Sequence, residues 1–221
     1  MKAKPLRSIR KVSETKDQVE IQKGFPKPFL DLNSEYVNYY LNKITSLVDD
    51  ILNQNYSEVP LYKVPDKYNY AKWKFRVLKS PQDGMQIKNF YSEKLKELIL
   101  DENIPTVSWN SFDANSNIKE HVDPPYYGKN LWRILVPLAC EDSYVTSNDL
   151  GTFKVELGKP FILDFIYDNH SGQNKSKTVD LTFLCFDILY EHEQDYQGDY
   201  MSNDPLYVKV LNIDMGAYEK L

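Results

Sequence analysis

A succession of short strand-like segments fills the second half of the chain, and this pattern constrains the fold more than any other feature. The segments are rich in β-branched and aromatic residues, and turn signals such as Asp123-Pro124-Pro125, Asn148-Asp149 and His170-Ser171-Gly172 separate them. They cover residues 74–78, 106–109, 118–121, 132–138, 151–155, 160–166 and 179–189. A further strand is expected around residues 207–213. Many short strands of this kind predict an all-β sandwich or barrel.

Two helical patterns precede most of these strands. Between residues 34 and 52 apolar side chains recur every three or four positions, which is the stripe of an amphipathic helix, and Ser34 is a suitable N-cap. A second helix is expected over residues 92–100, where Leu95, Leu98 and Ile99 share one face. The chain therefore reads as α+β, with the helices packed outside the sheet.

Length and composition predict one domain. A chain of 221 residues, 42% of them hydrophobic and 14% aromatic, can bury a single sizeable core. Residues 1–25 carry a basic segment without an apolar run, so we expect a flexible arm there and no secretory signal. Residues 26–221 are expected to form the domain.

Several classes of protein are disfavoured. A net charge of −5 and a pI near 5.3 argue against nucleic acid as a partner, because backbone phosphates require a dense cationic surface. No apolar run reaches the ~18 residues that a membrane span needs. Cys140 and Cys185 lie inside apolar runs, where thiols act as small hydrophobic groups, so a cytoplasmic location is expected.

The placement of the histidines suggests a metal site. The chain has only three, and two of them, His121 and His170, stand at turn-like strand ends. His121 and Asp123 form an H-x-D triplet, whose two side chains share one face of an extended strand. Two histidines and one carboxylate form the facial triad of non-haem Fe(II) oxygenases. The alternative is that His121 and Asp123 are an ordinary exposed pair and that His170 is a turn residue.

Residues 106–189 resemble a known family, the cupin-like aspartyl/asparaginyl β-hydroxylases and free-proline cis-hydroxylases, which are Fe(II)/2-oxoglutarate dioxygenases. The order and spacing of several pieces carry this resemblance. They are the strand at 106–112, the H-x-D ending at Asp123, residues 130–138, residues 157–164, the segment 168–171 around His170, and a closing strand at 181–188.

The resemblance implies a double-stranded β-helix, or jelly-roll, in which His121, Asp123 and His170 hold Fe(II). It also implies 2-oxoglutarate and O₂ as co-substrates, and hydroxylation of an amino acid, a peptidyl residue or a similar small polar molecule. Arg133 would project inward beside the metal and meet a carboxylate, since arginine holds such groups with two hydrogen bonds.

The sequence departs from the family at two positions. Asp180 stands where the family has an arginine for the far carboxylate of 2-oxoglutarate, and Leu135 replaces a residue that is often polar. Either Lys177 takes over from that arginine on a shifted register, or Arg133 alone anchors the co-substrate, or 2-oxoglutarate is not used. The last case describes a non-catalytic metal-binding relative. A jelly-roll binding module with coincidental histidines is a further alternative.

Overall fold

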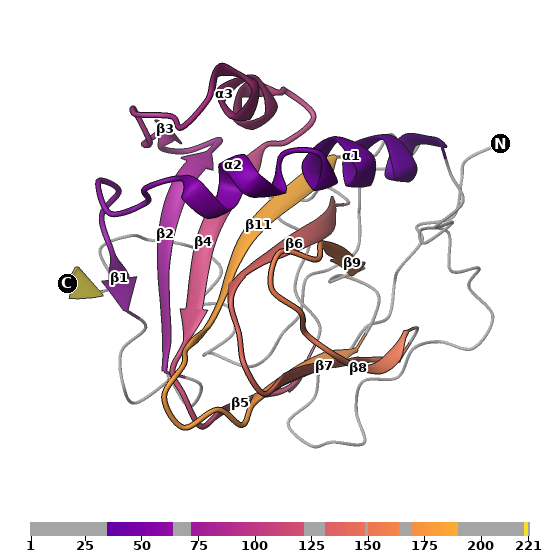
Figure 1. Cartoon of the computed structure of the whole chain (residues 1–221). Helices are drawn as coiled ribbons and strands as arrows, with labels where there is room; N and C mark the ends of the chain where they lie inside the picture. The colour runs from indigo at the N-terminus through magenta and orange to yellow at the C-terminus, as the bar shows by residue number, and fades with distance from the viewer. Residues whose placement is uncertain are drawn as a thin grey trace, which may run out of the picture.

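Two antiparallel sheets face each other in the computed structural model, which describes residues 35–63, 72–121, 131–148, 150–163, 169–189 and 219–220 (Figure 1). The large sheet has the strand order β12-β1-β2-β4-β11-β6-β9, with β3 beside β2, and the small sheet has the order β5-β10-β7-β8. The large-sheet strands are β1 (Tyr62–Lys63), β2 (Trp73–Ser80), β3 (Gly84–Met85), β4 (Thr106–Phe112), β6 (Leu131–Ala139), β9 (Phe161–Leu163), β11 (Leu181–Leu189) and β12 (Glu219–Lys220). The small-sheet strands are β5 (Ser116–His121), β7 (Ser143–Ser147), β8 (Gly151–Lys154) and β10 (His170–Asn174).

The strand order is that of a jelly-roll. Eight consecutive strands, β4 to β11, build the quartet β4-β11-β6-β9 in one sheet and the quartet β5-β10-β7-β8 in the other. The chain passes between the sheets so that the first and last of these strands, β4 and β11, pair with each other, and so do the second and seventh, β5 and β10. This double Greek-key arrangement is the double-stranded β-helix of the cupins, and the predicted fold class is confirmed.

Four short links join the two sheets at one end. They are residues 113–115 between β4 and β5, residues 140–142 between β6 and β7, residues 155–160 between β8 and β9, and residues 175–180 between β10 and β11. Backbone hydrogen bonds from Asn115 N to Ser176 O and from Lys175 N to Asp142 O hold three of these links together. We call this the linked end, and the opposite strand ends the open end.

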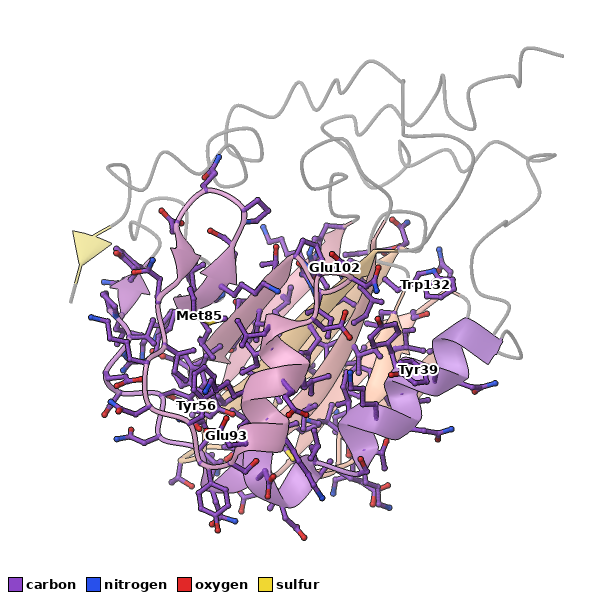
Figure 2. All side chains as sticks on the ribbon, turned by 90° about the horizontal axis from the view of Figure 1, so that it is seen from above. Tyr39, Tyr56, Met85, Glu93, Glu102 and Trp132 are labelled. Atoms are coloured by element: carbon purple, nitrogen blue, oxygen red, sulfur yellow. The ribbon has the colours of Figure 1, made fainter. Side chains whose placement is uncertain are left out.

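The helices lie on the outer face of the large sheet, as the view from above shows with Tyr39 on α1 and Glu93 on α3 (Figure 2). The sequence predicted one helix over residues 34–52, but the structure has α1 (Glu35–Thr45) and α2 (Val48–Asn53). The hydroxyls of Thr45 and Ser46 donate to the carbonyls of Leu41 and Lys43, so side chains compete for the acceptors at this break. The proposed cap Ser34 lies outside the described residues.

The second predicted helix is confirmed as α3 (Glu93–Leu100). Its N-cap is Ser92, whose hydroxyl accepts a hydrogen bond from Leu95 N at 3.1 Å. Leu95, Leu98 and Ile99 are fully buried against the sheet. None of the described helices is long and apolar enough to cross a membrane.

The predicted turn at residues 170–172 is wrong, because these residues belong to strand β10. Strand β7 was also not predicted. The sequence of β10, His-Ser-Gly-Gln-Asn, contains no aliphatic or β-branched residue, so its strand state comes from pairing with β5 on one side and β7 on the other. The strand expected around residues 207–213 and the expected arm at 1–25 lie outside the described residues.

An apolar cluster fills the space between the sheets near the linked end. It is formed by Leu135, Val145, Val155, Leu163, Leu181, Phe183 and Cys185. Cys140 packs against this cluster, and neither cysteine forms a disulfide. The interior of the barrel is therefore closed by hydrophobic packing at the linked end.

Asp101, just after α3, connects the helical layer to the sheet. Its carboxylate accepts hydrogen bonds from Lys43 Nζ at 3.1 Å, from Asn103 N at 3.0 Å and from the Tyr40 hydroxyl at 3.3 Å. Lys79 Nζ of β2 donates to the Asp101 carbonyl at 2.8 Å. Burial alone would raise the pKa of Asp101, but the Asn103 N–H, Lys43 and Tyr40 together lower it below its ordinary value.

A lowered pKa means that Asp101 stabilises the fold only while it is ionised. Asp101→Asn should therefore reduce the free energy of unfolding near neutral pH by about 1 kcal/mol. The difference from the wild type should shrink as the pH falls below about 4, where the wild-type carboxylate becomes protonated. Urea unfolding of both proteins at several pH values measures this, and a difference that does not depend on pH would refute the electrostatic explanation.

Candidate metal centre

His121 and His170, which lie 49 positions apart in the sequence, are direct cross-strand partners in the small sheet. His121 ends β5, and His170 begins β10 at the open end. Their ring centroids are 4.3 Å apart, with an angle of 54° between the ring planes. Two imidazoles at this separation suit a pair of ligands to one metal ion.

Both histidines face the interior of the barrel, and for His121 this depends on a bulge in β5. Gly172 pairs with Ile118 and His170 pairs with His121, so two steps along β10 correspond to three steps along β5. In a regular strand, residues three positions apart such as Ile118 and His121 would point to opposite faces of the sheet, and the bulge brings them to the same face. The alternation of β10 buries His170, Gly172 and Asn174 on the inner face, and His170 is only 5% exposed.

A backbone carbonyl fixes the orientation of the His121 ring. The Nδ1 atom of His121 lies 2.6 Å from the carbonyl oxygen of Lys119. A carbonyl can only accept, so Nδ1 carries the proton, and the neutral ring has its lone pair on Nε2. Metal-binding histidines are commonly held by this kind of contact, and the imidazole pair therefore fits a divalent transition metal.

The third predicted ligand, Asp123, lies outside the described residues. Its place in the site remains a prediction based on the H-x-D triplet that follows the last described residue of β5. Among the residues that the structure describes, no group of three or more His, Cys, Asp or Glu side chains could hold a metal ion. The described part of the predicted site is the two histidines.

Arg133 does project inward, and it forms an ion pair with Asp187. Arg133 Nε lies 2.5 Å from Asp187 Oδ1, and Nη2 lies 3.1 Å from Oδ2. Both residues belong to the inner face of the large sheet, on neighbouring strands β6 and β11. The side chain of Asp187 is 3% exposed and that of Arg133 is 24% exposed. Within the pair, the guanidinium is therefore the more accessible group and the carboxylate is buried.

Lys177 lies in the link between β10 and β11, and it is exposed. His170 begins β10, whereas Lys177 follows its last residue, so the structure places this lysine at the linked end and does not bring it to the histidines. Asp180 belongs to the same link, where it accepts a hydrogen bond from Ala114 N at 2.9 Å. Leu135 is buried in the apolar cluster between the sheets. Of the two predicted co-substrate contacts, only Arg133 is at the open end.

Asp187 is a site residue that sequence reasoning missed. It occupies an apolar strand, and an ionised side chain in such a strand needs a partner. That signal was present in the sequence, but the partner depends on the register that pairs Asp187 with Arg133 on one side and with Thr106 of β4 on the other. Thr106, Asp187 and Arg133 form a polar row at the open end of the large sheet.

No family model matches the sequence, and no curated protein matches it. Several solved structures of cupin-domain proteins are similar in fold. The cupin domain of Schizosaccharomyces pombe Cnp3 shows 16% identity and a TM-score of 0.35, covering 53% of this chain and 65% of that one. A predicted oxalate decarboxylase of Thermotoga maritima shows 14% identity and a TM-score of 0.38, covering 62% and 97%. A cupin-2 domain of Rhodospirillum rubrum shows 9% identity and a TM-score of 0.41, covering 64% and 76%. The jelly-roll assignment rests on the strand order itself.

Removing one partner of the Arg133–Asp187 ion pair should reduce the stability of the fold more than replacing both partners with apolar residues. Asp187→Ala leaves a partly buried guanidinium without its carboxylate and should cost about 3 kcal/mol of unfolding free energy. The double variant Arg133→Met, Asp187→Leu removes both charges and should cost clearly less. Urea denaturation of the three proteins measures both values. Equal losses in the two variants would show that packing, and not charge, determines the effect.

Proposed function

We propose that the chain binds Fe(II) through His121, His170 and Asp123 and uses it, with 2-oxoglutarate and O₂, to hydroxylate an amino acid, a peptidyl residue or a similar small polar molecule. The observation that carries this proposal is the inward-facing cross-strand pair of His121 and His170. The resemblance of residues 106–189 to the hydroxylases supplies the type of reaction.

The predicted site residues that the structure describes at the open end each have a role in this proposal. His170 supplies a ligand from within the barrel, where its burial keeps the ring in place. His121 supplies the second through Nε2, because Lys119 holds its Nδ1 proton. Arg133 is the inward cation that would meet a carboxylate of the small molecule, and Asp187 orients its guanidinium. Bound Fe(II), with 2-oxoglutarate and O₂, supplies the oxidising chemistry.

A second candidate is a metal-binding protein that does not use 2-oxoglutarate. It is favoured by the charges around Arg133 and Lys177. Asp187 neutralises the inward arginine, and Lys177 lies at the opposite end of β10. Within the described residues, neither provides the unneutralised inward cation that would replace the arginine missing at Asp180.

Anaerobic titration distinguishes the two candidates. Fe(II) is added first and 2-oxoglutarate second, and the visible spectrum is followed for the weak metal-to-ligand charge-transfer band of a chelated keto acid. We expect the band in the wild type and its loss in His170→Ala. Gln173→Ala, an exposed position on the same strand, is the matched control and should retain the band.

The other possible results contradict one candidate or both. Fe(II) binding without a band would contradict the hydroxylase and leave the metal-binding protein. If the wild type and His170→Ala bind Fe(II) with equal affinity, the histidine pair is not the metal site, and both candidates fail.

A further inference from the structure

Next to the histidine pair, toward the linked end, the inner face of the small sheet carries an apolar row. Ile118 of β5, Gly172 of β10 and Val145 of β7 lie in register across the three strands. Inward positions alternate along β10, so this row directly follows the one that holds His170 and His121. On this sheet the metal ligands are therefore bordered by an aliphatic surface.

The glycine in the middle of the row allows the side chain of Ile118 to lie across β10. A Cβ atom on Gly172 would lie 3.0 Å from Ile118 Cδ1, closer than the roughly 3.5 Å at which carbon atoms pack well. It would lie 3.6 Å from the Cβ and Cγ1 atoms of Ile118, which is an ordinary contact. The φ angle of Gly172 is not in the left-handed region, so its backbone conformation does not require glycine. The Cδ1 methyl group of Ile118 is what excludes a side chain at position 172.

Ile118 faces the interior of the barrel, yet it is only half-buried. Its neighbour Val145 is 6% exposed and belongs to the apolar cluster between the sheets, whereas Ile118 does not belong to that cluster in the described part of the chain. The core therefore leaves part of this inward aliphatic side chain uncovered. An accessible apolar wall beside a few fixed polar groups is the usual composition of a site for a small molecule.

We propose that Ile118 is a specificity-determining residue that receives an aliphatic group of the substrate beside the metal, and that Gly172 positions it. The assignment rests on the proposed function for the metal and the reaction, and it adds the class of the reacting group. A charged or strongly polar group against Ile118 would lose its hydration without gaining a hydrogen bond there. The carbon to be hydroxylated is thus expected to belong to an uncharged aliphatic group.

The test uses Co(II), whose visible d–d bands report on the ligands of the metal, and neutral imidazoles that bind a metal through one nitrogen. The protein is kept in excess over Co(II), so that no free metal binds the probe. The probes are imidazole, N-methylimidazole, N-propylimidazole and N-hydroxyethylimidazole, of which the last two match in length and differ in polarity. The wild type should bind N-propylimidazole about tenfold more tightly than N-hydroxyethylimidazole, because the hydroxyl loses its hydration against the wall.

Two variants change the wall in opposite directions. Ile118→Ala removes it and should reduce the preference for the propyl group about tenfold, the effect of deleting methylene contacts in an apolar pocket. Gly172→Ala should displace the Cδ1 methyl group into the space beside the metal and weaken N-propylimidazole about tenfold, while imidazole changes less than about threefold.

Rescue identifies the contact through which Gly172 acts. The double variant Gly172→Ala, Ile118→Val lacks the Cδ1 atom and keeps only the contacts at 3.6 Å. It should therefore regain the wild-type affinity for N-propylimidazole. A merely structural role of Gly172 would not give a loss that depends on the size of the probe and is reversed by shortening Ile118.

The matched control is Ile162→Val in β9. Ile162 is 4% exposed and packs in the core cluster that also contains the buried side chains of the helices. Loss of its Cδ1 methyl group should lower the urea midpoint of unfolding and leave the affinities for all the imidazoles unchanged. Ile118→Val, at a half-buried position, should lower the midpoint less.

The outcomes separate this inference from the proposed function. If Co(II) binds but wild type and Ile118→Ala show the same preferences among the probes, the wall is overturned and the metal site stands. A loss in Gly172→Ala that Ile118→Val does not reverse overturns the positioning role. If Gly172→Ala does not fold, folding of the double variant supports that role, and its failure to fold contradicts it. If Co(II) binds equally to wild type and His170→Ala, or to neither, the proposed function and the wall both fail.

Discussion

The pairing of β5 with β10 is the contact on which the candidate site depends. It brings His121 next to His170, and its one-residue bulge turns His121 to the same face as Ile118. Strand β10 needs no hydrophobic side chain of its own to hold its place, because β5 and β7 form backbone hydrogen bonds with it on both sides. A strand held in this way can carry histidine, glycine and asparagine on its buried face, which is the composition that a polar site requires.

The interior of the barrel is apolar near the linked end and polar at the open end. At the linked end, apolar side chains from both sheets pack together, and three of the four links bind one another through backbone hydrogen bonds. At the open end the inward positions are occupied by His121, His170, Thr106 and the Arg133–Asp187 pair. Hydrophobic packing at one end thus holds together the strands that position the polar groups at the other.

The fold class could be predicted from the sequence alone, and so could the choice of His121 and His170 as candidate ligands. The strands of the large sheet are apolar and aromatic, so their pattern is visible, and the scarcity of histidine drew attention to His121 and His170. The polar strand β10 was not recognisable, since tertiary pairing and not local preference makes it a strand. The bulge and the partner of Arg133 depend on register between segments distant in sequence, which a single sequence does not contain.

The charge of the open end determines how a carboxylate would be held there. A lone inward arginine attracts anions by its net charge, whereas the charge of Arg133 is neutralised by Asp187, so a carboxylate would be held there by the direction of hydrogen bonds more than by net charge. The same neutralisation allows the guanidinium to remain partly buried without a ligand. Asp187 therefore contributes to the stability of the barrel and at the same time lowers the net positive charge of its open end.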